Sequence, residues 1–254
     1  MLRNRIIPIL LLQDGGLVKT QQFKKPVYVG DPINAVRIFN EKEVDELALL
    51  DISRARNRNE PDYELIRDIV SEAFMPIAYG GGIESEKQIE KLFRIGIEKV
   101  ILSTVTIKNP DFISKAASVS GSQSIVVCID YFKRKIFGDG LLINGNKTWK
   151  SIDVFDHSKK MEDLGAGELI ITNVNCEGMM KGYDIPLIEK ISNELSIPVI
   201  ANGGASSIDD LALAIKAGAS AAAAGSIFVF QGKHKAVLIT YPKYTDIQAK
   251  FNSK

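Results

Sequence analysis

A short glycine-ending motif occurs twice in this chain, and this repeat restricts the possible folds more than any other feature. The segment MPIAYGGG at residues 75–82 resembles IPVIANGG at residues 197–204, about half a chain later. The apolar segment that follows each copy also corresponds, residues 96–103 with residues 218–225. A repeat with this period predicts two equivalent halves, at about residues 1–120 and 121–254.

Short apolar runs alternate with amphipathic segments along both halves. The runs are mostly continuous, which is typical of strands buried on both faces. Helix-start signals stand between them, namely Asp31-Pro32, Ser85 with Gln88, Asn109-Pro110, Asp184 with Pro186, and Ser207 with Asp210. The predicted strands are Ile6–Leu12, Glu46–Ile52, Met75–Tyr79, Lys99–Leu102, Ser124–Ile129, Glu168–Thr172, Pro198–Ala201 and Ala221–Ala224.

Eight strands in alternation with about eight helices predict a parallel sheet, and the number eight favours closure into a barrel. The 254 residues suit one α/β barrel domain. An open doubly wound sheet is the alternative, but it does not naturally produce a half-chain repeat. We therefore expect an α/β fold, a single (β/α)8 TIM barrel over residues 1–254 with a two-fold half-barrel repeat.

Composition excludes several classes of protein. Lys and Arg total 32 against 31 Asp and Glu, a net charge of +1, which excludes electrostatically driven binding to nucleic acid or a membrane surface. Two cysteines, Cys128 and Cys176, cannot form a disulfide framework or a four-thiolate zinc site. Two histidines argue against a histidine-rich metal centre or a Ser-His-Asp triad. We expect no metal and no cofactor, with carboxylates carrying any proton chemistry.

The N-terminus does not predict a targeting segment. Its apolar run, Ile6–Leu12, is short, contains Pro8 and lacks a small-residue cleavage site. The longest stretch of small apolar residues, Ala217–Phe230, is too short to span a bilayer. The expected location is the cytoplasm.

Glycine-rich turns follow corresponding strands in the two halves. In a barrel of this type the active site lies at the carboxyl ends of the strands, where backbone N–H groups of such turns can hold anions. These glycines could also serve only to permit tight turns. Their occurrence in two related copies, each followed by a hydroxyl-bearing turn, favours two phosphate sites on opposite sides of the mouth. The residues concerned are Gly81, Gly82, Ser103 and Thr104 in the first half, and Gly203, Gly204, Gly225 and Ser226 in the second.

Charged and polar side chains at the same end of the barrel are candidates for substrate contacts. Asp130 ends the fifth strand, and Asp51 and Thr172 end the second and sixth. Each aspartate could instead be a helix cap. Lys19, in the loop after the first strand, could reach over a phosphate, or be an ordinary solvated lysine. Glu177, beside Cys176 and Gly178, could face the substrate, whereas Cys176 has no histidine partner for thiol catalysis.

Four charges of alternating sign stand at the opposite end of the predicted barrel. Arg5, Glu46, Lys99 and Glu168 begin the first, second, fourth and sixth strands. Inward-pointing side chains at these positions would form a ring. Burying them unpaired would cost several kcal/mol, so we expect them to pair as a plug or a gate.

An ordered set of motifs from Arg5 to about Phe228 is similar to the cyclase subunit of imidazole glycerol phosphate synthase, a barrel enzyme of histidine biosynthesis. The motifs are Asp14-Gly15, Val18-Lys19, Gly30-Asp31-Pro32, Leu50-Asp51-Ile52, Gly80-Gly81-Gly82-Ile83, Lys108-Asn109-Pro110, Gly121-Ser122-Gln123, Ile129-Asp130, Gly165-Ala166-Gly167-Glu168, Gly182-Tyr183-Asp184 and residues 197–204. The resemblance implies a class I glutaminase bound at the barrel bottom. It also implies that ammonia passes the gate charges Arg5, Glu46, Lys99 and Glu168 to reach the mouth.

The catalytic mouth departs from this family. The family uses two aspartates, at the ends of the first and fifth strands, as acid and base. Here Asp130 is retained, but Leu11 occupies the other position, and leucine cannot transfer a proton. Ser103 stands where Asn is usual, Glu177 where Asp is usual, and Asn175 replaces an acidic residue. These changes favour a paralogue with a different reaction.

Several functions are consistent with this pattern. The preferred hypothesis is an ammonia-channelling synthase subunit that serves amidination of a surface-polysaccharide (lipopolysaccharide O-antigen) sugar. An amidating enzyme is then a possible third partner. The alternatives are an authentic cyclase in which Asp14, Asp51 or Glu177 replaces the lost acid, and a non-catalytic scaffold that activates a glutaminase. A barrel isomerase of the same pathway is disfavoured because it needs no gate.

Overall fold

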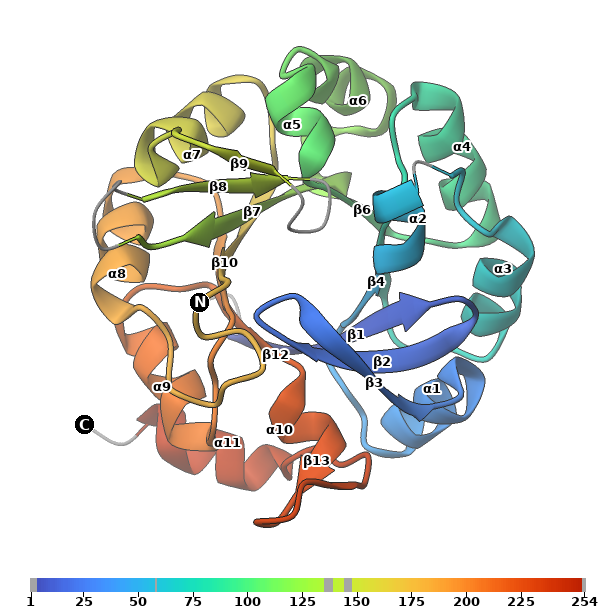
Figure 1. The fold of residues 1–254 in the computed structure, drawn as a ribbon, viewed down its shortest axis with the longest axis vertical. Coiled ribbons are helices and arrows are strands. Elements are labelled where there is room, and N and C mark those ends of the chain that lie inside the picture. The colour runs from blue at the N-terminus through green and yellow to red at the C-terminus, as the bar shows by residue number, and fades with distance from the viewer. Residues whose placement is uncertain (1–3, 58, 135–138, 144–147, 253–254) are drawn as a thin grey trace.

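Eight parallel strands close into a barrel with helices around it in a computed structural model of the chain (Figure 1). The structure describes residues 4–57, 59–134, 139–143 and 148–252. Strand β1 lies between β12 and β4, and pairing of β7 with β10 closes the ring. The barrel strands are β1 (Arg5–Gln13), β4 (Leu47–Asp51), β5 (Ile77–Gly80), β6 (Lys99–Leu102), β7 (Ile125–Phe132), β10 (Glu168–Asn173), β11 (Val199–Asn202) and β12 (Ala221–Ala224).

All eight predicted strands are confirmed, with ends shifted by a few residues at most. Their apolar runs are continuous because both faces of the sheet are covered. On β1, Ile7, Ile9 and Leu11 belong to a cluster that fills the barrel interior. Ile6 and Leu10, which alternate with them, belong to the larger cluster between strands and helices.

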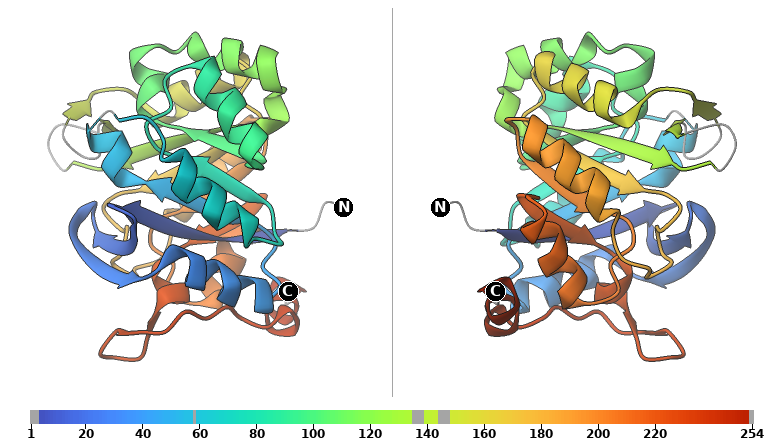
Figure 2. Two further views of the ribbon diagram at one scale, coloured as in Figure 1. Left: turned by 90° about the vertical axis from the view of Figure 1, so that its right-hand side faces the viewer. Right: turned by 90° about the vertical axis from the view of Figure 1, so that its left-hand side faces the viewer.

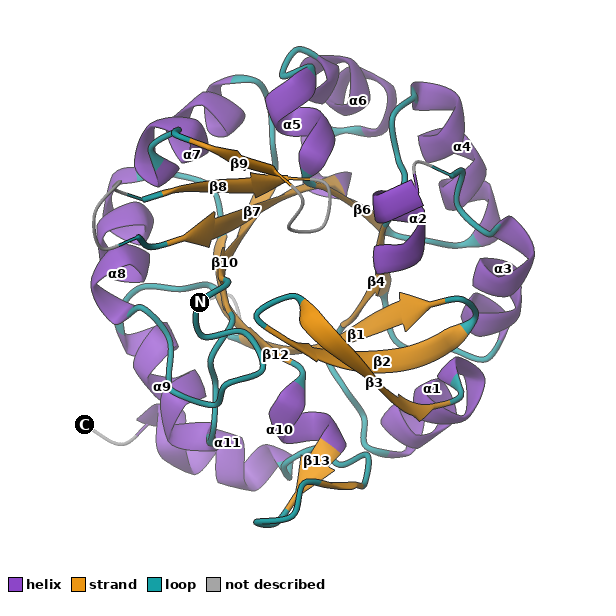
Figure 3. Ribbon diagram, in the orientation of Figure 1, coloured by secondary structure: helices purple, strands orange, loops and turns teal. Residues whose placement is uncertain are grey.

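The helices surround the barrel, as Figure 3 shows, and several begin at the predicted caps. The side chains of Asp31, Ser85 and Ser207 each accept a hydrogen bond from the backbone N–H three residues later. The helices are α1 (Pro32–Glu41), α2 (Ile52–Asn57), α3 (Tyr63–Ser71), α4 (Glu86–Ile95), α5 (Thr104–Lys108), α6 (Phe112–Ser120), α7 (Val154–Asp163), α8 (Ile185–Glu194), α9 (Ile208–Lys216), α10 (Ser226–Val229) and α11 (Tyr244–Asn252).

Two helix starts differ in detail from the prediction. Asn109 ends α5, and the helix predicted to open at Asn109-Pro110, α6, begins two residues later, at Phe112. The capping box predicted for Ser207 and Asp210 is half formed. The Asp210 carboxylate accepts from the N–H and hydroxyl of Ser206 and so does not close the box on Ser207.

Three hairpins absent from the predicted pattern extend from the end of the barrel opposite the N-terminus (Figure 2). They are β2 (Gly16–Gln21) with β3 (Lys24–Gly30), β8 (Gly140–Ile143) with β9 (Thr148–Lys150), and β13 (Phe230–Gln231) with β14 (Ala236–Val237). β2 continues antiparallel from β1, so this first hairpin lies beside the barrel mouth (Figure 1). None of the helices described in the structure is long and apolar enough to cross a membrane.

The two-fold repeat is visible in the order of the elements. The first half contributes β1, β4, β5 and β6, and the second contributes β7, β10, β11 and β12. Gly81-Gly82 follows the third strand of the first half, and Gly203-Gly204 follows the third strand of the second. Two glycine-rich turns therefore lie at opposite sides of one barrel mouth.

Candidate functional site

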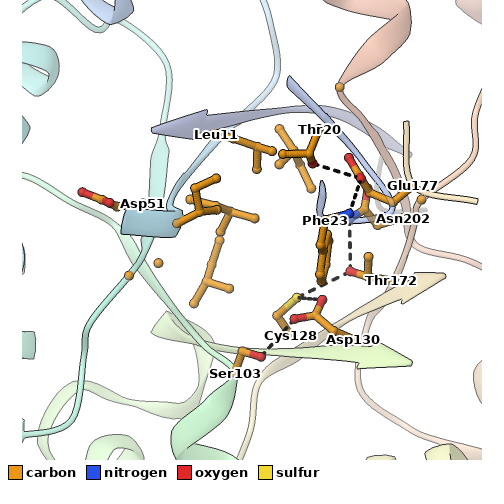
Figure 4. A pocket seen from close by; sticks show the side chains of 18 of the residues that line it. Leu11, Thr20, Phe23, Asp51, Ser103, Cys128, Asp130, Thr172, Glu177 and Asn202 are labelled. Atoms are coloured by element: carbon orange, nitrogen blue, oxygen red, sulfur yellow. Dashed lines mark hydrogen bonds between the residues drawn. The ribbon is translucent and has the colours of Figure 1, made fainter. Parts of the chain in front are cut away.

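A cavity opens at the carboxyl ends of the barrel strands, and the predicted mouth residues meet there (Figure 4). Leu11 also lines this cavity. The structure thus brings together residues separated by most of the chain length. The predicted residues on the cavity wall are Lys19, Asp51, Gly81, Gly82, Ser103, Thr104, Asp130, Thr172, Glu177, Gly178, Gly203, Gly204, Gly225 and Ser226.

Asp130 is the centre of a hydrogen-bonded cluster on one side of the cavity. The Ser103 hydroxyl donates to its Oδ2 at 3.2 Å, and the Cys128 thiol donates to its Oδ1 at 3.4 Å. Burial raises the pKa of Asp130 to about 6, although hydrogen bonds from Cys128, Ser103 and Thr172 oppose that shift. A carboxyl group that titrates near neutral pH is suited to accept and return a proton.

Thr172 and Asn202 extend this polar side along the next two strands. Thr172 on β10 is paired in register with Asp130 on β7 and with Asn202 on β11. The Asn202 amide donates to the Thr172 hydroxyl at 3.1 Å. Sequence reasoning did not assign Cys128 or Asn202 to the site. The signal for Cys128 was its place two residues before Asp130, which puts both side chains on the same face of one strand.

Leu11 lies among aliphatic side chains on the other side of the cavity. It is paired in register with Leu50 on β4. Leu50 and Ile52 are partly buried and pack against the interior cluster that contains Leu11 and Ile101. Figure 4 shows Leu11 facing the cavity, with Asp130 on its far side. Leu11 is therefore part of an apolar surface of the cavity.

Asp51 ends β4, but its carboxylate is used locally. Its Oδ1 accepts from the backbone N–H of Ser53 at 3.0 Å, from the Ser53 hydroxyl at 2.7 Å, and from the N–H of Arg54 at 3.0 Å. The carboxylate points away from the cavity centre in Figure 4. This is the helix-cap alternative considered from the sequence, with Asp51 at the start of α2.

Lys19 lies in strand β2, which corrects the prediction of a loop, and its side chain is only 6% exposed. Its Nζ is 3.6 Å from Glu177 Oε1. Burial lowers the pKa of Lys19, and Glu177 opposes that change. The Lys19 ammonium also lies directly against Gly225, where any larger residue would collide with it. A buried cation is thus held beside the second glycine-rich turn.

Glu177 attaches the β2–β3 hairpin to the loop that follows β10. Its Oε2 accepts from the Thr20 hydroxyl at 3.0 Å and from the Phe23 N–H at 3.2 Å. Its carbonyl accepts from the Gln22 N–H at 2.9 Å. Gly178 follows in a left-handed conformation, packed against the Thr20 backbone. Thr20 and Phe23 also line the cavity, and sequence reasoning had not assigned either.

The four predicted gate residues form a closed ring of ion pairs at the opposite end of the barrel. Lys99 Nζ lies 3.0 Å from Glu46 and 2.9 Å from Glu168, and Arg5 pairs with both carboxylates. Glu46 and Glu168 are about 95% buried. The expected mutual pairing is confirmed. Between this ring and the mouth lies the interior cluster of Ile, Val, Ala, Leu and Cys side chains.

The residues described in the structure contain no group of three or more His, Cys, Asp or Glu side chains arranged to hold a metal ion. Cys128 and Cys176 are both free thiols. Burial raises the pKa of each thiol, so neither is activated as a nucleophile.

Comparison with known proteins agrees with the fold. A family model described as histidine biosynthesis protein matches residues 5–235. A Pseudomonas aeruginosa protein provisionally named imidazole glycerol phosphate synthase subunit hisF2 is 50% identical, over 95% of this chain and 97% of that protein. Its provisionally named counterparts hisF3 of Vibrio vulnificus and HisF of Leptospira borgpetersenii are each 49% identical, over 95% and 99% of this chain and 94% and 100% of their own lengths. The chain belongs to the histidine biosynthesis protein family and is similar along nearly its whole length to imidazole glycerol phosphate synthase subunits of the HisF type, as a divergent paralogue.

Proposed function

We propose that this chain is the synthase subunit of a glutamine amidotransferase that receives ammonia through its barrel, with a reaction other than two-aspartate cyclisation at its mouth. The proposed partner is a class I glutaminase, bound at the barrel bottom in a heterodimer. The proposed process is amidination of a surface-polysaccharide (lipopolysaccharide O-antigen) sugar in the cytoplasm, with an amidating enzyme as a third partner. No cofactor is required for ammonia delivery.

The observation that carries this proposal is the contrast between the two ends of the barrel. The ion-paired ring of Arg5, Glu46, Lys99 and Glu168 is complete, and it closes an apolar interior that suits passage of a small neutral molecule. At the mouth, the position opposite Asp130 is occupied by Leu11. Loss of one of two cooperating acid and base groups costs about 10²–10⁴ in rate.

Authentic cyclase activity is the second candidate, and one observation favours it. The pKa of Asp130 is about 6, so this single carboxyl could take both roles in turn. Two of the carboxylates considered as replacements for the missing acid are already engaged in other contacts. Asp51 accepts hydrogen bonds from Ser53 and Arg54. Glu177 contacts Lys19, Thr20 and Phe23. This engagement favours the first candidate.

Growth of a histidine auxotroph that lacks its own cyclase tests the proposal. The expected result is no growth when this chain is expressed with its glutaminase, and growth with an authentic cyclase as the positive control. Rescue by the wild-type chain would overturn the proposal in favour of the cyclase.

Glutaminase turnover then separates a conduit from a scaffold. We expect the chain to increase glutaminase turnover. Lys99→Met in the ring is expected to change the rate at which ammonia reaches an acceptor at the mouth, while the glutaminase still binds. A scaffold would increase glutaminase turnover without any effect of ring variants on an acceptor reaction.

A further inference from the structure

The cavity wall is divided into a polar side and an aliphatic side, and the division follows the strand order. On β7, β10 and β11 the residues at one level are Asp130, Thr172 and Asn202, which are paired in register. On β1 and β4 the residues paired in register at the mouth are Leu11 and Leu50. At this level the wall formed by β7, β10 and β11 offers hydrogen-bonding side chains, and the wall formed by β1 and β4 offers hydrocarbon side chains.

The aliphatic side is a continuous surface. Leu11, Leu50, Ile52 and Ile101 all line the cavity and belong to one packed cluster. Asp51 is the carboxylate nearest to this surface in sequence, and its oxygen Oδ1 is occupied by Ser53 and Arg54. A ligand that contacts these four side chains lays an apolar face on them or leaves polar groups without partners, which is costly.

The polar end of such a ligand is fixed by the distribution of positive charge. Lys19 and Lys108 are the cationic residues that line the cavity among the residues the structure describes. Lys108 is exposed, whereas Lys19 is buried against Gly225 and has its carboxylate partner at 3.6 Å. A phosphate near Gly225 would bring negative charge to a buried ammonium, where a charge-assisted contact is strong.

We propose that the mouth selects a phosphorylated ligand with an apolar or aromatic body, with its phosphate beside Lys19 and Gly225 and its body on the Leu11–Leu50 surface. This inference names the ligand class of the mouth and rests on the proposed function only in taking the mouth as the acceptor site. Leu11 is then a specificity-determining residue. Its side chain is a binding surface in the place where a cyclase would have an acid.

Isothermal titration of the isolated chain with two phosphomonoesters tests this directly. Phenyl phosphate and glycerol 3-phosphate present the same phosphate on an apolar and a polar body. Burial of the phenyl ring on the aliphatic side is expected to make phenyl phosphate about tenfold tighter or more. Equal affinities, or no binding of either ester at millimolar concentrations, would overturn the proposal.

Three variants locate the effect. Leu11→Asn is expected to reduce the preference for phenyl phosphate over glycerol 3-phosphate to about twofold, and to leave the affinity for glycerol 3-phosphate almost unchanged. Lys19→Met is expected to weaken both esters about tenfold or more, and Lys108→Met to weaken them less. Leu213→Asn, on the exposed face of α9, is the matched control and should keep the wild-type preference. A preference that survives Leu11→Asn, or a larger loss in Lys108→Met than in Lys19→Met, would contradict the assigned orientation.

These titrations use no glutaminase, no ammonia and no auxotroph. Selective binding of phenyl phosphate by a chain that rescues a histidine auxotroph would uphold this inference and reject the proposed function. Failure of auxotroph rescue together with equal affinities for the two esters would reject this inference and leave the proposed function standing.

Discussion

Leu11 and Leu50 are paired in register near the ends of β1 and β4, and Leu11 lies on the side of the mouth opposite Asp130 (Figure 4). Leu11 is 6% exposed and packs within the interior cluster, so its side chain also contributes to stability. Leu11 is therefore part of a packed apolar surface at the mouth. The predictions below follow from this surface and from the charged groups on either side of it.

Leu11→Asp is expected to lower the free energy of unfolding at pH 7 by about 1–3 kcal/mol, because it places a carboxyl group among aliphatic side chains. The loss should shrink at pH 5, where a buried carboxyl group takes up a proton. Urea denaturation at both pH values measures it. Leu213→Asp, at a position 50% exposed, should change stability by less than about 0.5 kcal/mol. Equal losses in the two variants would show that Leu11 is not packed.

Asp130 should make the wild-type chain less stable as pH rises through its titration. Its pKa is raised from 3.8 to about 6 in the folded state, so the folded chain binds more protons than the unfolded chain between these values. The unfavourable contribution of Asp130 to the free energy of folding grows from pH 4 to pH 6 and reaches its maximum above pH 6. Asp130→Asn is therefore expected to be about 1–3 kcal/mol more stable than wild type at pH 8, with no gain below pH 4.

Urea denaturation of both proteins across this pH range provides the check. The difference between the two curves isolates Asp130 from other titrating groups. A gain that is largest at low pH would have the wrong sign for a carboxyl with a raised pKa.

Arg5→Met is expected to destabilise the chain by about 1–3 kcal/mol, because it leaves the buried carboxylates Glu46 and Glu168 to share one cation, Lys99. Arg37→Met removes a surface ion pair to Glu72 and should cost at most about 1 kcal/mol. Chemical denaturation in low and high salt compares them. A cost for Arg5→Met no greater than that for Arg37→Met would show that the ring is only a solvated strand end.

Glu177→Gln should loosen the β2–β3 hairpin, because it weakens the contacts to Thr20 and Phe23 and removes the carboxylate beside Lys19. Trypsin cleavage after Lys24, which is exposed on β3, should become several times faster. The exposed Glu84, on the far side of the cavity, gives the control Glu84→Gln, which should leave cleavage unchanged. Unchanged cleavage in Glu177→Gln would mean that the hairpin is held by its backbone contacts alone.

Local signals predict the barrel strands and several helix caps well, for physical reasons. A strand covered on both faces needs a continuous apolar run, and β1 and β12 display one. Ser85 and Gln88 form their capping box within four residues of chain. The β2–β3 hairpin was missed because β3 is mostly exposed and carries no such run.

The charges in the site depend on contacts that no local pattern contains. Lys19 is buried because the loop after β10 supplies Glu177, more than half a chain away. The direction of the Asp51 carboxylate is set by the hydroxyl and N–H groups of Ser53 and Arg54. The sequence predicts that Lys19 and Asp51 lie at the mouth. The contacts that each side chain makes decide whether it is available to a ligand.

Turnover of the phosphoribosyl substrate of histidine biosynthesis with free ammonia tests the central claim most directly, in wild type and in Leu11→Asp. We expect no turnover at an enzymatic rate by the wild-type chain, because Leu11, which lies opposite Asp130, cannot transfer a proton. Activity that appears in Leu11→Asp would assign the divergence to this one position. Turnover by the wild-type chain at a normal enzymatic rate would contradict the account and identify an authentic cyclase.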